Sequence, residues 1–470
     1  MMDKIISIYF LQKVFNNISK KPYLKIAKYN KNLQNKLNLS IDTYIKYSQQ
    51  IEIEIIPYLK GLKKKSIQNE FIYIKNKKDK PFYHIYFDEE KEEVKRTYIK
   101  KNENISKIRV LIDNEVKTIE ELFNECHYVK EIKFIKFNRT DFTNYNSMFF
   151  NCLNLISLDI SKLKTNYVKN MNNMFSQCSK LKNIDLSNFN TNNVEDMSYM
   201  FHGCSSLEKL DLLNFSTNNV ENMSYLFGGC ESLKELNISS FNTEKVEDMS
   251  CMFQECKSLI NLDLSNLITD NTKQMSFIFY DCSSLKELNI SNFNTDKIID
   301  MSCMFSGCSK IEKLDLSKFK TDKVEDMEKM FHGCLVLNDL NISNFKFKKS
   351  TKVQYMFSKC SEHLKNEIRK KYKNLNEKAF DDYEDNSSYE YSFVYEENEE
   401  ENIDDEENEE ENNNDGDNEE EMNDDEENEE ENNDDEGNEE ENNDDEENEE
   451  EMNDDEENEE EMNDDDDEDE

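Results

Sequence analysis

Cysteine is the residue type whose spacing first suggests chemistry in this chain of 470 residues. Thiols can form disulfides, bind metal ions, or fill a core as small apolar side chains. Zinc sites typically use Cys-x-x-Cys pairs, and the sequence has none. The pattern therefore favours a buried ladder of free thiols, with disulfides and a metal site as alternatives. Ten of the twelve cysteines form this ladder at a constant interval of 26 residues: Cys126, Cys152, Cys178, Cys204, Cys230, Cys256, Cys282, Cys308, Cys334 and Cys360.

The other two cysteines, Cys251 and Cys303, lie outside this register. They occupy the position that holds a tyrosine in the units of Tyr199 and Tyr225. Because alkylation requires access to the thiol, we expect Cys251 and Cys303 to be the most reactive cysteines of the folded protein. The five histidines do not cluster with the cysteines in sequence, which argues against a Cys–His nucleophile. We expect no cofactor, no metal site and no catalytic residue.

The constant interval predicts a solenoid, because a unit of this length can bury its apolar side only by stacking on its neighbours. In the unit of Cys204, the residues Met197, Met200 and Phe201 precede the cysteine with the spacing of one helix face. Asp196 stands where an N-cap residue would lie. The sequence therefore predicts a short helix in each unit.

Leucines follow the cysteine of each unit in the pattern L-x-x-L-x-L, as at Leu207, Leu210 and Leu212. This pattern predicts a strand whose alternate side chains point away from the core. Units such as "LKELNISNFNTDKIIDMSCMFSGC" resemble the BspA-like leucine-rich repeats of surface proteins, and the resemblance covers about 107–362. It implies an adhesive or protein-binding role. The predicted fold is an α/β solenoid, a right-handed leucine-rich-repeat coil with a parallel concave sheet.

The outward positions of the predicted strands are the candidate partner-binding residues. Their second members alternate between Asp and Asn, so the sequence also has a period of 52 residues. Duplication of a two-unit block is the favoured explanation, and an array adapted to a ligand is the alternative. The candidate residues are Lys209 and Asp211, Glu235 and Asn237, Asn261 and Asp263, Glu287 and Asn289, and Lys313 and Asp315.

Charge divides the chain into parts. Residues 1–100 carry a net charge of +10, residues 101–380 are neutral, and residues 381–470 carry −56 without any Lys or Arg. We expect a basic helical or α+β module over 1–100, about ten solenoid units over 101–362, a capping helix over 363–380, and a disordered acidic tail. The expected module contains two predicted strands, "IEIEII" and "FYHIYF", and helical periodicity over its first 50 residues.

These features favour a non-enzymatic protein-interaction scaffold whose acidic tail could also attract a basic protein. No run of eighteen apolar residues occurs, so no membrane insertion is expected, and no motif for specific nucleic-acid binding is recognised. Without an export signal, the expected location is cytoplasmic, with the cell surface as the alternative. One alternative function is a BspA-type adhesin. Another is a ubiquitin-ligase adaptor, because residues 10–37 are loosely similar to an F-box motif but lack its Leu-Pro start.

Overall fold

The computed structural model describes residues 46, 48–63 and 69–383. The helical periodicity, the F-box-like segment and nearly all of the acidic tail lie outside the described residues. The elements are β1 (Ile51–Pro57), the 3-10 helix η3 (Lys77–Phe82), β2 (Tyr83–Phe87), β3 (Ile108–Ile112), β4 (Val129–Lys136), β5 (Ser157–Asp159), β6 (Lys209–Asp211), β7 (Glu235–Asn237), β8 (Asn261–Asp263), β9 (Glu287–Asn289), β10 (Lys313–Asp315), β11 (Asp339–Asn341), the helix α5 (Glu362–Lys371) and the 3-10 helix η4 (Glu377–Phe380).

The first five strands form one sheet in the order β2-β3-β1-β4-β5. β1 pairs antiparallel with both β3 and β4, and β4 pairs parallel with β5. The two strands predicted from "IEIEII" and "FYHIYF" are confirmed as β1 and β2, and their buried residues alternate as a half-buried strand requires. The residues on both sides of the boundary predicted at residue 100 contribute strands to this one sheet.

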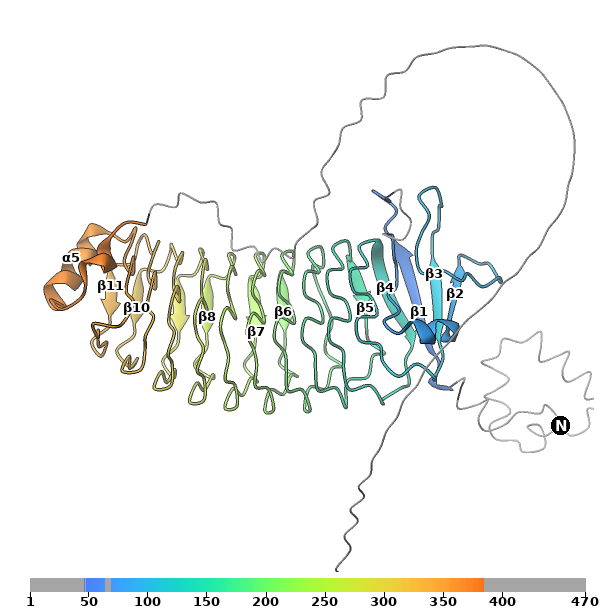
Figure 1. Cartoon of the computed structure of the whole chain (residues 1–470), viewed down its shortest axis with the longest axis horizontal. Coiled ribbons are helices and arrows are strands. Elements are labelled where there is room, and N and C mark those ends of the chain that lie inside the picture. The colour runs from blue at the N-terminus through green and yellow to red at the C-terminus, as the bar shows by residue number, and fades with distance from the viewer. Residues whose placement is uncertain (1–45, 47, 64–68, 384–470) are drawn as a thin grey trace, which may run out of the picture. The chain divides into compact units, whose positions relative to one another are not determined.

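Beyond this sheet the chain forms a β-solenoid of about eight turns, in which strands β5 to β11 follow one another in chain order (Figure 1). Eight isolated parallel bridges connect equivalent residues 26 positions apart, from Asn144 paired with Asn170 to Asp326 paired with Lys352. Each repeat of the sequence is therefore one turn of the solenoid, as its constant interval predicts.

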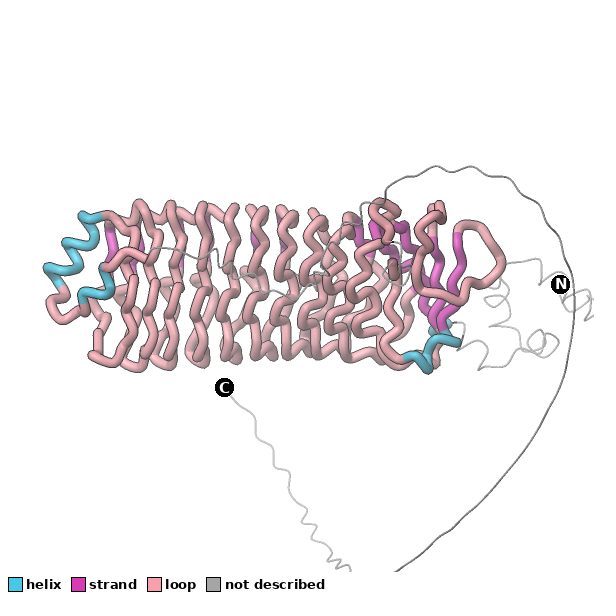
Figure 2. Tube along the Cα trace, turned by 45° about the horizontal axis from the view of Figure 1, so that its top comes forward, coloured by secondary structure: helices cyan, strands magenta, loops and turns pink. Residues whose placement is uncertain are grey.

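The helix predicted in each unit is wrong. Met197, Met200, Phe201 and Cys204 are all buried, but their segment consists of turns. Tyr199 has a left-handed φ of 58°, which interrupts a right-handed helix. Figure 2 shows helices only near the two ends of the described solenoid, with loops and short strands between them. The fold is thus a β-solenoid rather than the predicted α/β solenoid.

Backbone hydrogen bonds between turns replace the helical ones. The N–H groups of Tyr199, Phe201 and Gly203 donate to carbonyl oxygens of the next turn, at N–O distances of 2.9, 3.0 and 2.8 Å. Because these donors are every second residue, the segment pairs with the next turn as a parallel ladder does. Apolar spacing at i, i+3, i+4 and i+7 thus identified the buried side chains but not the backbone conformation.

The predicted continuous parallel sheet is also absent from the described solenoid. Strands β6 to β11 have three residues each and form three separate pairs, β6-β7, β8-β9 and β10-β11. Each pair joins a strand that ends in Asp to one that ends in Asn, as in Asp211 and Asn237. The 52-residue period of the sequence is therefore the period of strand pairing.

A stack of phenylalanine rings runs through the solenoid interior. The Phe three residues before each ladder cysteine is buried, and neighbouring rings lie nearly parallel. The stack extends from Phe123, whose ring centroid lies 5.5 Å from that of Phe149, to Phe357, which stacks on Phe380 of η4 at 5.5 Å. Continuous burial of these rings stabilises one turn against the next.

The segment after the last turn closes the carboxyl end of the solenoid. The N–H groups of Tyr355 and Phe357 donate to the carbonyl oxygens of Lys378 and Ala379, at 2.9 and 2.8 Å. These acceptors stand where a further turn would supply its carbonyls. In the same segment, α5 buries Leu364 and Ile368. Within the described residues, no helix is both long and apolar enough to cross a membrane.

Candidate functional site

The ten predicted binding residues all lie at the outer positions of strands β6 to β10. The central leucine of each strand points inward: Leu210, Leu262 and Leu314 are buried, and Leu236 and Leu288 are partly buried. Strand register aligns Lys209 with Glu235 and Asp211 with Asn237, and the same relation holds in the next pair. We call the outer side chains of β6 to β11 the strand face.

The first residues of four strands carry exposed charged side chains: Lys209, Glu235, Glu287 and Lys313. Lys209 Nζ lies 2.6 Å from Glu235 Oε1 in the neighbouring turn. The two side chains remain 63% and 66% exposed, so their ion pair contributes little to stability. The side chains of Asn261 in β8 and Glu287 in β9 are also exposed. These first positions are therefore free to exchange their contacts for those of a partner.

The second residues of the strands have a structural role that the sequence analysis missed. Asp211 Oδ1 accepts a hydrogen bond from the backbone N–H of Leu213 at 3.1 Å, which is an Asx turn. It also accepts one from Asn237 Nδ2 at 2.9 Å. The backbone N–H of Ser265 lowers the pKa of Asp263 by the same kind of hydrogen bond. Asn fits the alternate positions because its carbonyl oxygen can accept the same bond, as Asn237 does from Ser239.

The cysteine ladder is buried inside the solenoid, and all twelve cysteines are free thiols. The thiol of Cys204 donates to the carbonyl oxygen of Phe175 at 3.1 Å, and the backbone N–H of Cys178 donates to the same oxygen. The same contact recurs at every ladder cysteine from Cys152 to Cys360. The ladder thiols therefore complete the hydrogen bonding of buried carbonyl groups, in addition to filling space.

Burial also suppresses the acidity of these thiols. It raises the pKa of Cys204 to about 12, and the pKa values of Cys251 and Cys303 also to about 12. Cys251 and Cys303 are 4% and 7% exposed, against none for Cys204. The geometry is that of structural thiols, and within residues 46, 48–63 and 69–383 no three His, Cys, Asp or Glu side chains could hold a metal ion together.

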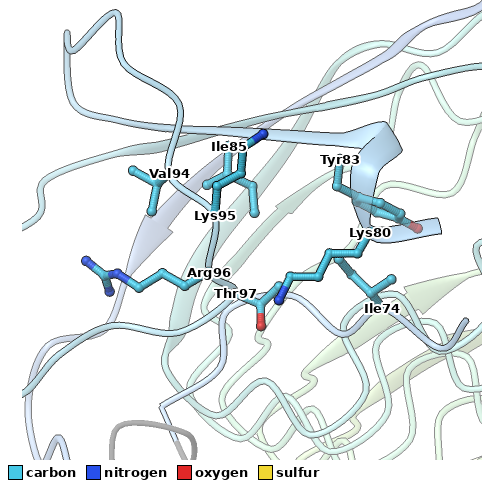
Figure 3. Close-up of a pocket in the computed structure, with 8 residues that line it drawn as sticks. All are labelled: Ile74, Lys80, Tyr83, Ile85, Val94, Lys95, Arg96 and Thr97. Atoms are coloured by element: carbon cyan, nitrogen blue, oxygen red, sulfur yellow. The ribbon is translucent and has the colours of Figure 1, made fainter. Parts of the chain in front are cut away.

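A pocket near the amino-terminal sheet has a volume of only about 20 Å³ (Figure 3). Lys80, Lys95 and Arg96 contribute to its lining together with apolar residues such as Val94. Arg96 already forms an ion pair with Glu103 at 2.5 Å. The volume suits about one water molecule, whereas small-molecule sites are at least tenfold larger, roughly 300 Å³ or more. This pocket is therefore not a candidate substrate site.

An aromatic surface on the turns is a further feature that the sequence analysis missed. Tyr199, Tyr225, Phe277 and Tyr355 occupy the same position in four turns, and Tyr280 packs against Phe277 at a centroid distance of 5.5 Å. All five side chains are partly buried, and the rings of Tyr199 and Tyr225 stack at 4.5 Å. We call these five residues the aromatic row. The first four of these residues are separated by multiples of 26 residues, and this spacing could have revealed the row.

Comparison with protein-family models gives three overlapping matches along the repeats. They cover residues 117–211, 178–288 and 273–389, which together are more than half of the chain. The repeated match is consistent with the BspA-like resemblance and with the solenoid turns. No curated protein matches the chain. On the strength of these three matches, the chain belongs to the family described as "Mycoplasma protein of unknown function, DUF285".

Proposed function

We propose that this protein is a non-enzymatic scaffold that binds a protein partner through the strand face. The observation that carries the proposal is the alignment of outward polar side chains on successive turns, in the register of Lys209 with Glu235. An extended array of this kind is the usual binding surface of solenoid proteins. The leucine spacing typical of leucine-rich repeats supports the use of this side, which we propose is concave.

The charges of the strand face supply specificity in this proposal. Lys209 and Lys313 alternate with acidic and amide side chains along the strands. A partner of complementary pattern would bind, and one with like charges opposite them would be rejected. The net charge of −56 on residues 381–470 supports a second role for the tail, attraction of a basic protein over about a Debye length of 8 Å.

Charge reversal on the strand face tests the proposal. The variant Lys209→Glu with Lys313→Glu changes two exposed residues of β6 and β10. The matched control is Lys273→Glu with Lys346→Glu, which breaks exposed ion pairs to Glu247 and Asp322 at other positions of the turn. We expect the strand-face variant to weaken binding of the partner by about tenfold and the control to leave it unchanged. Equal affinity of both variants would overturn the proposal.

A BspA-type adhesin is the second candidate function, because the repeats resemble those of surface proteins and the family match is consistent with them. We propose a cytoplasmic location instead, supported by twelve cysteines that are all free thiols, as is usual in a reducing compartment. Labelling of intact cells with a membrane-impermeant amine reagent tests this. Modification of the protein on intact cells, but not of a known cytoplasmic protein, would favour the adhesin.

A further inference from the structure

Each repeat contains a four-residue loop after the strand position, and the charge of this loop changes along the solenoid. In five turns the loops together hold two lysines and two acidic residues, so they are neutral. In the last three turns the loops hold six lysines and two aspartates, a net charge of +4. The neutral loops are 164–167, 190–193, 216–219, 242–245 and 268–271, and the positive loops are 294–297, 320–323 and 346–349.

Buried threonines hold the positive loops in register. Thr295 Oγ1 donates to the carbonyl oxygen of Lys320 at 2.9 Å and accepts a hydrogen bond from the backbone N–H of the same residue at 2.8 Å. Thr321 makes the same two bonds with Lys346, at 3.2 and 2.7 Å. Because equivalent residues of neighbouring turns lie about 4.8 Å apart, the exposed side chains of these loops are stacked at a fixed spacing.

The two aspartates of the positive loops are already paired. Lys320 Nζ lies 2.9 Å from Asp296 Oδ2, and Lys346 Nζ lies 2.5 Å from Asp322 Oδ1. The hydrogen bond from Lys346, together with the charge of Lys348, lowers the pKa of Asp322. In the last turn Lys348 itself stands where the aspartate would be, so the series of pairs ends with an excess of positive charge. Four exposed lysines of these loops make no ion pair with the described residues, and we call them the basic edge: Lys297, Lys323, Lys348 and Lys349.

Three lysines of the basic edge, Lys297, Lys323 and Lys349, are stacked on consecutive turns. Lys297 follows an asparagine of the preceding turn, and its Nζ donates to Asn271 Oδ1 at 2.7 Å. Lys323 and Lys349 each follow a lysine instead, and among the described residues neither Nζ has a hydrogen-bond acceptor. Like charges stacked on neighbouring turns repel each other. A bound anion would therefore relieve a repulsion that the fold itself leaves in place.

A phosphate group suits this spacing better than a carboxylate does. A phosphorylated side chain carries a charge of about −1.5 to −2 at pH 7 and three acceptor oxygens, so lysines on two neighbouring turns can donate to the same group. A carboxylate brings a single negative charge and two oxygens. The net charge of −46 on the chain repels long anionic polymers and anionic membranes, which favours a compact ligand.

We propose that the basic edge binds a phosphorylated segment of a protein partner. Lys323 and Lys349 hold the phosphate between them, and Lys297 and Lys348 add positive charge on either side. The basic edge lies at a different position of the turn from the strand face, so this site does not depend on the proposed function. It gives the protein a second binding surface, whose occupation follows the phosphorylation of the partner.

A synthetic phosphopeptide tests the proposal on the full-length protein. The probe contains glycine, serine and two phosphoserines separated by one residue, which places both phosphates on one face of an extended peptide. It carries an uncharged dye, and its fluorescence anisotropy reports binding. We expect no binding of the unphosphorylated peptide at the same protein concentrations, and about tenfold weaker binding when glutamates replace the phosphoserines. No binding of the phosphopeptide, or equal affinity for the glutamate peptide, would overturn the proposal.

Substitutions locate the site. Lys323→Gln with Lys349→Gln should weaken binding of the phosphopeptide by about tenfold, whereas Lys323→Arg with Lys349→Arg keeps both charges and should keep the affinity. The matched control, Lys164→Gln with Lys245→Gln, removes the same charge from the neutral loops and should not change the affinity. Equal weakening by the control and the edge variant would show that the peptide responds to net charge alone, which would contradict binding at the basic edge.

Two other classes of anion serve as competing ligands. A single-stranded RNA oligonucleotide and vesicles that contain phosphatidylserine should both bind the full-length protein at least tenfold more weakly than the phosphopeptide at the same salt concentration. Tighter binding of either one, lost in the edge variant, would overturn the assignment of a phosphorylated protein segment. The strand-face variant Lys209→Glu with Lys313→Glu should leave phosphopeptide binding unchanged, so the two sites are tested separately.

Discussion

At the residue scale, each ladder thiol fills a core position and also donates a hydrogen bond. Cys256 shows both roles, because its side chain is fully buried and its thiol lies 3.2 Å from the carbonyl oxygen of Phe227. An alanine at this position would leave a small cavity and a carbonyl with one hydrogen bond fewer. A serine would keep a donor on a shorter side chain.

We therefore expect Cys256→Ala to lower the free energy of unfolding by about 1–2 kcal/mol. Cys256→Ser should lower it less, because the hydroxyl can still donate to Phe227. Urea unfolding followed by circular dichroism measures both values. A serine variant less stable than the alanine variant would show that only the apolar character of the thiol matters.

The buried thiols also predict how stability depends on pH. Burial raises their pKa above that of an unfolded cysteine, about 8.5, and to about 12 for Cys204. A raised folded pKa stabilises the protein fully below the unfolded value, and this contribution is lost as the pH rises toward the folded value. We expect the urea midpoint to fall as the pH is raised above about 8.5. A constant midpoint in this range would contradict burial of the ladder.

Alkylation should distinguish three slightly exposed cysteines from nine that are fully buried. The side chains of Cys251, Cys303 and Cys360 are 4%, 7% and 6% exposed, whereas the remaining nine cysteines of the ladder are fully buried. We expect these three to react first with iodoacetamide in the folded protein, identified by mass spectrometry of peptides. Equal labelling of Cys204 at early times would mean that the ladder opens as a whole.

The Asx turns of the strand face should contribute to the stability of the fold. Asp315 Oδ1 accepts a hydrogen bond from the backbone N–H of Ser317 at 2.9 Å, which lowers the pKa of Asp315. Asp315→Ala should lower the melting temperature, and Asp315→Asn should leave it nearly unchanged because Asn341 already makes the same turn in β11. Equal melting temperatures of the alanine and asparagine variants would show that the Asx turn of Asp315 does not stabilise the fold.

At the element scale, two strands and the buried positions of the repeat could be predicted from the sequence. The backbone conformation of the repeat could not. The strands β1 and β2 follow from alternating apolar residues, and the burial of the repeat follows from its apolar spacing. The helix did not form because the left-handed residues of each turn let alternate N–H groups bond to the next turn. Gly203, at a φ of 69°, marks one such position, and a Cβ there would lie 2.5 Å from the Gln177 side chain. Glycine directly before the cysteine of several units was the available signal.

The segment that closes the carboxyl end of the solenoid should stabilise mainly the turns next to it. Phe380 is only 5% exposed and stacks on Phe357 at 5.5 Å. Phe380→Ala should lower the free energy of unfolding by roughly 3 kcal/mol. Because each turn contacts only its neighbours, the amides of Tyr355 and Phe357 should exchange faster while that of Phe201 should not.

Hydrogen exchange followed by mass spectrometry measures this difference, with Lys370→Ala as the control because its side chain is 73% exposed. Uniformly faster exchange along all turns would show that the solenoid unfolds as one cooperative unit rather than from its end.

At the scale of the whole molecule, the solenoid supplies a long surface built from one repeated backbone. The positions of the candidate site were predictable, because alternation in L-x-x-L-x-L determines which side chains point outward. The role of the second positions was not, because the Asx turn of Asp211 depends on the turn that follows β6. The aromatic row was missed because Tyr199 and Tyr225 were compared only with the cysteines that replace them, and the same position was not followed to Phe277 and Tyr355.

The most direct test of the account is site-specific photo-crosslinking from the full-length chain. A photoreactive amino acid replaces Lys209 or Lys313 on the strand face, and replaces Lys273 or Lys346 in the matched controls. We predict that both strand-face positions crosslink to the same protein partner and that the controls crosslink to it weakly or not at all. Crosslinking of that partner from Lys273 and Lys346, without any from Lys209 and Lys313, would contradict binding through the strand face.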